Sequence, residues 1–431
     1  MIRRTVLEWQ SISYGEDTAK LDTIPTKVAD RLAAVAATSP LAGVSRNGVL
    51  GHGRKALHAK GIVGIIAAEG CALEILPKID FPEEETEAAK GRIRQRLVHM
   101  LAAALDIRID VGEITGLGYQ NETFLEILVR IFLEKLNDEV RRGMPRQYIA
   151  HQEDLRALRG RLDVTRQFTL LAANPSRLAS DFDALSPDIA LNQIMKATVD
   201  RLSRLTQSTG NQRRLKELAF FYADVAAVPV LELRWDAVVL DRTNSRWREL
   251  LSFARLFLGE RYQTTSAGFS RGFSLLFKMH SLFEEYVAKQ ISRALVGSDL
   301  RVVSQGGRLY CLETPTGGVF QTKPDILIKN GSDTVQVIDT KWKRISSRIE
   351  DKKQGVSQAD IYQMMAYGHL YDAPRLTLLY PHHLELREDE GLLSSYRVNG
   401  LDRQVETATI DLAVAGGTVE RLRRVVNLSL D

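Results

Sequence analysis

Two acidic residues and a lysine stand in a segment whose pattern predicts a pair of neighbouring β-strands. Asp325 comes directly before the apolar run 326–328, and Asp339 and Lys341 end a second run that is rich in β-branched residues. An Asn-Gly turn signal at Asn330 separates the two runs, which predicts a β-hairpin. Because side chains alternate between the two faces of a strand, we expect Asp339 and Lys341 to project together.

This arrangement suits the hydrolysis of a phosphodiester bond with a metal ion. Hard oxygen ligands hold Mg²⁺, which can position a water and neutralise charge on the phosphate. We expect Asp325 and Asp339 to bind Mg²⁺, together with the backbone carbonyl of Thr340. Lys341 would orient or deprotonate the attacking water, or stabilise the charged phosphate, and the pattern leaves both roles open. The short pattern alone also fits a surface pair of Asp and Lys on one strand face.

A predicted helix after the hairpin adds two polar side chains. Residues 357–368 begin with capping residues, show helical spacing of apolar side chains and end at a glycine, so we expect a helix there. Gln363 and Tyr367 are four residues apart and therefore share one face of this helix. Both are candidate members of the site.

A second predicted helix, before the hairpin, offers a third acid. Residues 279–295 have the apolar spacing of an amphipathic helix. At about 100° per residue, Glu284 flanks the apolar stripe, whereas Glu285 lies almost opposite it. Glu284 is therefore the better candidate for an inward-facing metal ligand. A solvated glutamate at the border of the stripe fits the same periodicity equally well.

The order of these elements resembles the PD-(D/E)xK nuclease superfamily, including the Gln-x-x-x-Tyr variant of RecB-like nucleases. More narrowly, the chain resembles the McrC family, the nuclease subunits of McrBC-type restriction systems specific for 5-methylcytosine. The resemblance covers most of the chain and rests on the segments SLLFKMHSLFEEYVA, TKPDILI, VIDTKWK and DIYQMMAYGHLY, and on residues 61–79, 155–168 and 181–199.

The resemblance implies a metal-dependent DNA endonuclease that acts together with a partner. The implied catalytic residues are Asp325, Asp339, Lys341, Glu284, Gln363 and Tyr367, and the implied Mg²⁺ ligands are Asp325, Asp339, Thr340 and Glu284. The implied partners are a hexamer of an McrB-like AAA+ GTPase or ATPase, which recognises the modified base, and double-stranded DNA. The alternatives are a nuclease-fold adaptor that regulates an AAA+ NTPase without cutting, and a stand-alone RecB-like repair nuclease.

The glycine-rich stretch 48–55 is not a phosphate-binding loop, because it lacks the Gly-Lys-Ser/Thr ending that contacts the phosphates and magnesium. We therefore expect the nucleotide-driven motor to be another chain. By the resemblance, residues 44–60 form the element that projects into this motor, with its cations near the partner's phosphates. An ordinary solvated hairpin loop is the alternative. The expected partner-contacting residues are Arg46, Arg54, Lys55 and Lys60.

Length and composition favour a mixed α+β protein of several domains. The 431 residues are enough for two or three domains, and a net charge of +4 is compatible with a phosphate-binding face. Two cysteines in unrelated segments give no disulfide framework, and no apolar run is long enough to cross a bilayer, which favours a cytoplasmic protein. We predict a β-rich domain at 1–95 that contacts the NTPase, a mainly helical domain at 96–265 and a restriction-endonuclease-like α/β nuclease domain at 266–431.

Overall fold

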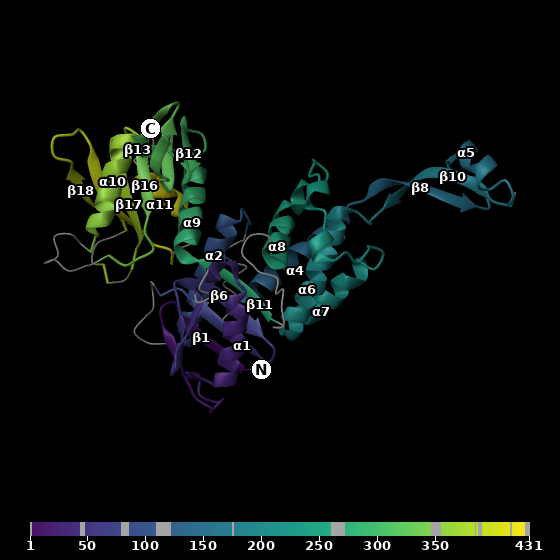
Figure 1. The fold of residues 1–431 in the computed structure, drawn as a ribbon, viewed down its shortest axis with the longest axis horizontal. Helices are drawn as coiled ribbons and strands as arrows, with labels where there is room; N and C mark the ends of the chain where they lie inside the picture. The colour runs from purple at the N-terminus through teal and green to yellow at the C-terminus, as the bar shows by residue number, and fades with distance from the viewer. Residues whose placement is uncertain are drawn as a thin grey trace. The chain divides into compact units, whose positions relative to one another are not determined.

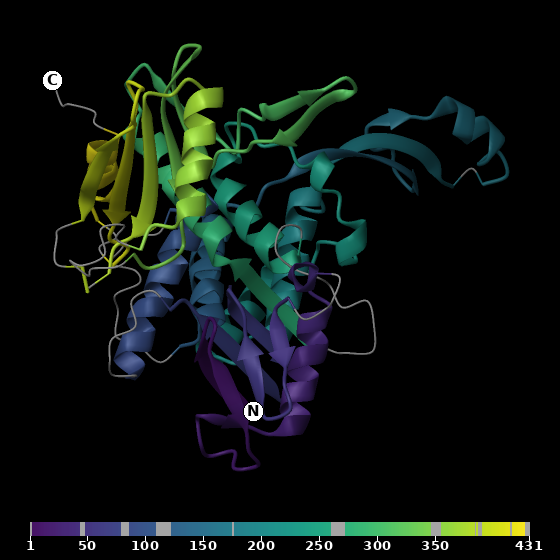
Figure 2. The same ribbon diagram turned by 60° about the vertical axis from the view of Figure 1, so that its left-hand side comes forward.

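The chain folds into two compact units, one formed by residues 1–127 with 262–431 and the other by residues 128–261. The computed structural model describes residues 2–43, 48–78, 86–108, 122–174, 176–259, 272–345, 355–383, 385–386, 390–413 and 416–426. Figure 1 shows the elements of both units in chain order, and Figure 2 gives a second view. Each unit is described by itself.

The N-terminal part of the first unit is built on a four-stranded sheet in the order β1-β7-β6-β11. β1 pairs with β7 in parallel, and the other neighbours are antiparallel. The central strands β6 and β7 are almost continuously buried, which explains their unbroken apolar sequences. The strands are β1 (Ile2–Leu7), β6 (Ile62–Ala68), β7 (Cys71–Leu76) and β11 (Gly272–Lys278).

A second, smaller sheet shares its core with the first. Its order is β3-β2-β5-β4, and the helix α1 (Thr26–Ala37) packs against β4 and β6 with its apolar face. A short 3₁₀ turn, Pro40–Ala42, follows this helix. The strands are β2 (Ser11–Tyr14), β3 (Thr23–Ile24), β4 (Leu50–His52) and β5 (Ala56–Ala59).

A buried ion pair holds the helix α2 (Glu87–Ala104) against this part of the unit. Arg94 Nη2 donates to Glu74 Oε2 of β7 at 2.8 Å, and both side chains are almost fully buried. The backbone N–H of Phe124 also donates to Glu74, at 2.8 Å from Oε1. Burying this carboxylate is tolerated because several donors compensate its lost hydration.

The second unit combines helices with a projecting sheet. Its helices are the greater part of α4 (Phe124–Arg142), α6 (Ala190–Leu205), α7 (Thr209–Phe221) and α8 (Arg248–Leu258), with 3₁₀ turns at Val230–Glu232, Trp235–Ala237 and Ser245–Trp247. The sheet has the order β8-β10-β9. It consists of β8 (Gln147–Leu155), β9 (Arg161–Leu162) and β10 (Leu178–Ser186), and the short helix α5 (Val164–Thr169) packs on β10. Within this unit, β8 and β10 extend away from the helices as an arm (Figure 1).

The C-terminal part of the first unit is a six-stranded mixed sheet in the order β12-β15-β16-β17-β19-β18. β16, β17 and β19 run parallel, whereas β12, β15 and β18 are antiparallel to their neighbours. An exposed hairpin of β13 and β14 lies between β12 and β15 in the chain. The strands are β12 (Leu300–Ser304), β13 (Tyr310–Thr314), β14 (Gly317–Gln321), β15 (Ile326–Asn330), β16 (Asp333–Thr340), β17 (Arg375–Pro381), β18 (Gly391–Arg397) and β19 (Gln404–Ile410).

Helices cover the two faces of this sheet. α10 (Gln358–Leu370) packs on the face that carries Val337 and Leu378, and Figure 2 shows it in front of the strands. The opposite face meets α11 (Thr418–Val425), where Gln336 Nε2 donates to Thr377 Oγ1 at 2.8 Å. α9 (Met279–Ala294) packs against α11, β12 and β16. By strand alternation Asp339 lies on the face covered by α10.

The mixed α/β, multidomain organisation predicted from the sequence is confirmed, and the predicted hairpin and α9 are present. The predicted end of α10 at Gly368 is wrong, because the helix continues to Leu370. A side chain at Gly368 would lie 2.8 Å from Leu376, so this glycine permits close packing and does not end the helix. No helix among the described residues is long and apolar enough to cross a membrane.

The compact units cut across the three predicted segments. Segments 1–95 and 266–431 both belong to the first unit, since β11 of the third segment completes the sheet of the first. The middle segment is mainly helical, and it also contains the β8-β10-β9 sheet. The assignment of 1–95 to partner binding, and of 266–431 to the nuclease, stays a prediction.

The pairing of β6 with β11 gives the first testable prediction. Gly64 has φ +128°, and a Cβ atom there would lie 2.0 Å from the carbonyl oxygen of Leu275. We expect Gly64→Ala to lower the free energy of unfolding of this unit by more than about 3 kcal/mol. Gly70→Ala is the control, because Gly70 has φ +74° but open space around it, so only about 1–2 kcal/mol is expected. Equal shifts of Tm in the two variants would contradict the account.

Candidate active site

The pairing of β15 with β16 brings Asp325 and Asp339 to one end of the six-stranded sheet. Ile326 pairs with Ile338, so the residues just outside this pair face each other. Asp325 Oδ2 accepts hydrogen bonds from the backbone N–H and the hydroxyl of Thr340, each at 2.8 Å. These two bonds fix the Asp325 carboxylate beside the end of β16 and leave its second oxygen for another partner.

Lys341 directly follows β16 and turns its amine toward Asp339. Lys341 Nζ lies 2.6 Å from Asp339 Oδ2, in an ion pair whose geometry is not that of a directed hydrogen bond. Burial lowers the pKa of the Lys341 ammonium, but the carboxylates of Asp339, Asp360 and Asp325 together raise it, so the net shift is upward. Asp339 is only 2% exposed, and burial, followed by repulsion from Asp325, raises its pKa to about 6.

The helix α10 holds Lys341 from the other side through two side chains. Ser357 caps the helix by accepting a hydrogen bond from the backbone N–H of Asp360, as the capping pattern predicts. Lys341 Nζ donates to Gln363 Oε1 at 3.1 Å, and Gln363 Nε2 donates to the Tyr367 hydroxyl at 2.8 Å. Tyr367 is 5% exposed, so a chain of hydrogen bonds runs from this buried tyrosine through Gln363 to the lysine.

Glu284 reaches the same site from α9. Burial, together with repulsion from Asp325, raises the pKa of Glu284 to about 7, although a hydrogen bond from Gln305 partly opposes the shift. The interpretation of the helical face is consistent with this position, because the charge of Asp325 acts on Glu284. All six predicted catalytic residues therefore lie together, and their roles in catalysis stay a prediction.

The chemistry of the donors fits a small divalent cation. The site brings together the carboxylates of Asp325, Asp339 and Glu284. Burial, followed by repulsion from Asp325, raises the pKa of Asp339 and of Glu284. Lys341 Nζ lies 2.6 Å from Asp339 Oδ2. Mg²⁺ prefers such oxygen ligands and commonly uses one or two carboxylates while keeping several waters. In the described part of the chain, no three His, Cys, Asp or Glu side chains are already placed closely enough together to hold a metal ion. Asp325 and Asp339 are thus the residues that would hold the ion, with Glu284 nearby.

The predicted contact of the Thr340 carbonyl with Mg²⁺ stays a prediction, and the structure gives Thr340 a further role. Its N–H and hydroxyl position Asp325, which the sequence pattern did not indicate. Asp360 is a further charged member of the site that the sequence analysis missed. Its Oδ1 lies 3.8 Å from Lys341 Nζ, and its Oδ2 accepts a short hydrogen bond from Lys343. Its position one helical turn before Gln363 is the signal that could have revealed it.

Three of the four predicted partner-contacting cations lie on or beside the hairpin of β4 and β5. Arg54 and Lys55 are exposed in the turn between β4 and β5, and Lys60 is partly buried just after β5. Arg46 lies outside the described residues. Contact of these side chains with a partner stays a prediction.

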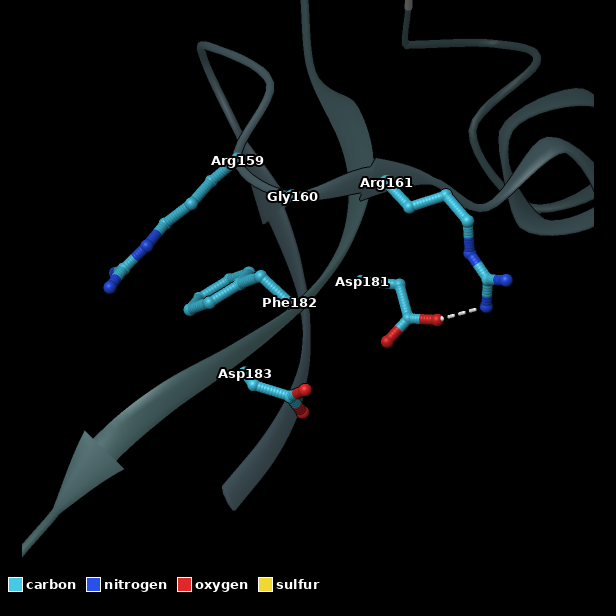
Figure 3. A pocket seen from close by; sticks show the side chains of 6 residues that line it. All are labelled: Arg159, Gly160, Arg161, Asp181, Phe182 and Asp183. Atoms are coloured by element: carbon cyan, nitrogen blue, oxygen red, sulfur yellow. Dashed lines mark hydrogen bonds and ion pairs between the residues drawn. The ribbon is translucent and has the colours of Figure 1, made fainter. Parts of the chain in front are cut away.

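A shallow hollow on the arm of the second unit is a separate candidate site (Figure 3). Arg161 Nη2 donates to Asp181 Oδ2 at 2.7 Å on one side, while the guanidinium of Arg159 lies over the ring of Phe182, 4.1 Å from its centre. His151 stacks on the same ring at 5.5 Å. Gly160 is required here, because a side chain would lie 2.5 Å from the carbonyl oxygen of Asp181. The lining of the hollow thus includes the Arg159 guanidinium, which lies over the Phe182 ring.

The fold and the site together define a mixed α/β protein with a cluster of acids and a lysine at the end of its sheet. Comparison with known families gives the more specific assignment. Residues 57–381 match the family described as "McrBC 5-methylcytosine restriction system component", and the chain belongs to this family.

Two solved structures are similar in fold. One is described as the refined half-complex from the tetradecameric assembly of Thermococcus gammatolerans McrB AAA+ hexamers with bound McrC; the TM-score is 0.72 at 20% identity, covering 99% of each chain. The other is described as the cryo-EM structure of the Thermococcus gammatolerans McrBC complex, with a TM-score of 0.53 at 22% identity over 68% of this chain and 88% of that chain. A comparison with curated proteins found no match.

The raised pKa of Glu284 predicts a dependence of stability on pH. Glu284 binds its proton more tightly in the folded than in the unfolded chain, so its contribution to the free energy of unfolding falls as pH rises from about 4.5 to about 7. We expect Glu284→Gln to raise Tm at pH 8 by roughly 2–4 °C without divalent ions, and to have little effect at pH 5.

The control for this prediction is Glu285→Gln on the same helix. It removes the same charge at the neighbouring position. We expect this variant to show no increase in Tm between pH 5 and pH 8 relative to the wild type. Thermal unfolding of both variants in EDTA from pH 5 to pH 8 tests the difference. A Glu284→Gln protein that is less stable than the wild type at pH 8 would contradict the crowding of charge at the site.

Proposed function

We propose that this chain is the nuclease subunit of an McrBC-type restriction system and hydrolyses DNA phosphodiester bonds with Mg²⁺. The observation that carries the proposal is the position of Lys341. Its Nζ lies 2.6 Å from Asp339 and 3.1 Å from Gln363, at the strand end where Thr340 fixes Asp325. Hydrolysis of a phosphodiester requires charged groups held in fixed positions around the phosphate. Backbone and side-chain hydrogen bonds hold this lysine and these two carboxylates in such positions.

The order of the site residues supports a PD-(D/E)xK nuclease domain. Asp325 stands directly before β15, and Asp339 and Lys341 stand at the end of the neighbouring strand. Gln363 lies on the helix that covers this face, and Glu284 on the helix that precedes the sheet. A surface pair of Asp and Lys would be exposed, whereas Asp339 is 2% exposed and is packed beneath α10.

Each residue of the site has its own role in this proposal. Asp325 and Asp339, with Glu284 nearby, would hold Mg²⁺, which when bound supplies positive charge against the phosphate and lowers the pKa of water. Lys341 presents its ammonium to the same space and faces the attacking water or the charged phosphate. Gln363 fixes the direction of this amine, and Tyr367 fixes Gln363 from the core.

The partner in this proposal is an AAA+ hexamer that hydrolyses GTP or ATP and recognises modified, double-stranded DNA. The likeness to a chain from a complex of McrB AAA+ hexamers with bound McrC supports it. Two surfaces could make the contact: the basic turn at Arg54 and Lys55, and the arm of the second unit. The arm exposes large apolar side chains, with Tyr148 at 74%, Phe168 at 73% and Leu170 at 76%. Large apolar side chains exposed on a projecting element favour contact with another protein.

Cleavage by the assembled complex tests the nuclease assignment. We expect Asp339→Asn and Lys341→Ala to reduce the rate of plasmid cleavage with Mg²⁺ at least about 100-fold, because each removes charge that acts on the reacting phosphate. Both proteins should still assemble with the partner in size-exclusion chromatography. Asp333→Asn is the matched control, since Asp333 is exposed at the other end of β16. Cleavage by Asp339→Asn at the wild-type rate would remove this site from the mechanism.

Stimulation of the partner tests the docking surfaces. We expect Phe168→Ser with Leu170→Ser to reduce the stimulation of NTP hydrolysis by the partner about tenfold or more, because truncating anchor residues of an interface costs about 1–4 kcal/mol. Removing the charges of Arg54, Lys55 and Lys60 tests the basic turn in the same assay. Both variants should keep the Tm of the wild type, since the changed side chains are largely exposed. Unchanged stimulation in both would show that the partner binds elsewhere.

A further inference from the structure

Glu8 is a buried carboxylate in the N-terminal part of the first unit that touches the edge of the nuclease site. It directly follows β1 and is 2% exposed. Its Oε1 accepts hydrogen bonds from the backbone N–H of Lys78 at 3.0 Å and from the indole N–H of Trp342 at 2.9 Å. Its Oε2 has no hydrogen-bond partner among the described residues. The contact with Trp342 joins residues 334 positions apart in the chain.

Trp342 connects this carboxylate to both parts of the candidate active site. It directly follows Lys341, so the position of the indole limits where the lysine backbone can lie. Its ring packs on Phe283, with ring centres 5.4 Å apart, and Phe283 directly precedes Glu284 on α9. The indole therefore lies between the segment that carries the lysine and the helix that carries the third acid.

The N-terminal sheet of β1, β7, β6 and β11 is also connected to the site through the backbone. β11 pairs with β6 along its whole length, and α9 begins at Met279, directly after β11. The N-terminal sheet is therefore covalently continuous with the helix of Glu284, while Glu8 bonds to the residue after Lys341. The sheet holds the site at two points that come from distant parts of the sequence.

The carboxylate at position 8 carries a cost in stability. Burial raises the pKa of Glu8, although the hydrogen bonds from Lys78 and Trp342 oppose this shift, so the charged form is costly in this place. An apolar side chain would avoid this cost but would leave the N–H groups of Lys78 and Trp342 without their acceptor. The buried Oε2 atom, which has no partner among the described residues, calls for an explanation beyond packing.

We propose that Glu8 is a positioning residue of the nuclease site, whose carboxylate fixes the Trp342 indole and thereby the placement of Lys341 relative to Glu284. The geometry of the site then depends on the N-terminal sheet, whose core is shared with the smaller sheet that carries the basic turn expected to meet the partner. This inference rests on the proposed nuclease function. It predicts that the bond between Glu8 and Trp342 affects catalysis without either residue touching the substrate.

Two variants remove the bond from either side. Glu8→Leu removes the acceptor, and Trp342→Phe removes the donor while keeping an aromatic ring against Phe283. In the complete complex, we expect each to lower kcat for DNA cleavage about tenfold and to raise the Mg²⁺ concentration needed for half-maximal rate, as is usual for residues that orient a metal site. The double variant should show no further loss, because both changes remove one interaction. Glu8→Gln keeps the acceptor and should recover most of the activity.

A readout that does not involve cleavage uses the free, full-length chain labelled with ¹⁵N at its tryptophans. The indole N–H resonance of Trp342, assigned by its absence from Trp342→Phe, should move upfield in Glu8→Leu and stay near its place in Glu8→Gln. Titration with Mg²⁺ should shift this resonance in the wild type, and higher concentrations should be needed in Glu8→Leu.

Glu74→Gln is the control for lost stability. Glu74 is an equally buried glutamate of the neighbouring strand, but its hydrogen-bond partners among the described residues are Arg94, Thr5 and the Phe124 backbone, which are not part of the site. It should lower Tm and leave kcat unchanged at temperatures well below unfolding. Wild-type kcat and Mg²⁺ dependence in Glu8→Leu would overturn the role of Glu8. A wild-type complex that does not cut DNA would instead overturn the proposed function, while the Mg²⁺ titration of the indole still tests the positioning.

Discussion

The two hydrogen bonds from Thr340 to Asp325 are the interaction on which the candidate site depends. They tie the residue before β15 to the last residue of β16, and so fix two acids from neighbouring strands at one end of the sheet. A shift of one residue in the pairing of β15 with β16 would turn Asp325 or Asp339 to the opposite face. The buried pair of Ile326 with Ile338 opposes such a shift, because both side chains are fully buried. The core of the sheet thus specifies the geometry of the charged groups.

The same geometry places charge where it costs stability. Asp339 and Glu284 have raised pKa values because burial and the charge of Asp325 disfavour their ionised forms. Lys341 offsets part of this repulsion, and Asp360 with Lys343 extends the charged network away from the acids. A protein selected only for stability would not gather these groups, and a bound cation would relieve the repulsion. Crowded charge of this kind is common at catalytic sites.

Local signals in the sequence predicted much of the site. The Asn-Gly turn located the hairpin, helical spacing located α9 and α10, and the phase of α9 favoured Glu284 over Glu285 as the candidate ligand. Interactions between distant segments could not be predicted in this way. The bond from Glu8 to Trp342 and the pairing of β11 with β6 join residues about 200 or more positions apart, and no local periodicity encodes them. The end of α10 was missed because Gly368 packs closely against Leu376 of β17 and does not end the helix.

Direct measurement of metal binding tests the central claim, that Asp325 and Asp339 form one divalent-cation site. Mn²⁺ can stand in for Mg²⁺, and its electron paramagnetic resonance signal distinguishes free from bound ion. Titration of the full-length chain should show one Mn²⁺ site that is lost in Asp339→Asn and in Asp325→Asn, and kept in Asp333→Asn. Binding that is equally tight in the wild type and in both active-site variants would contradict the account.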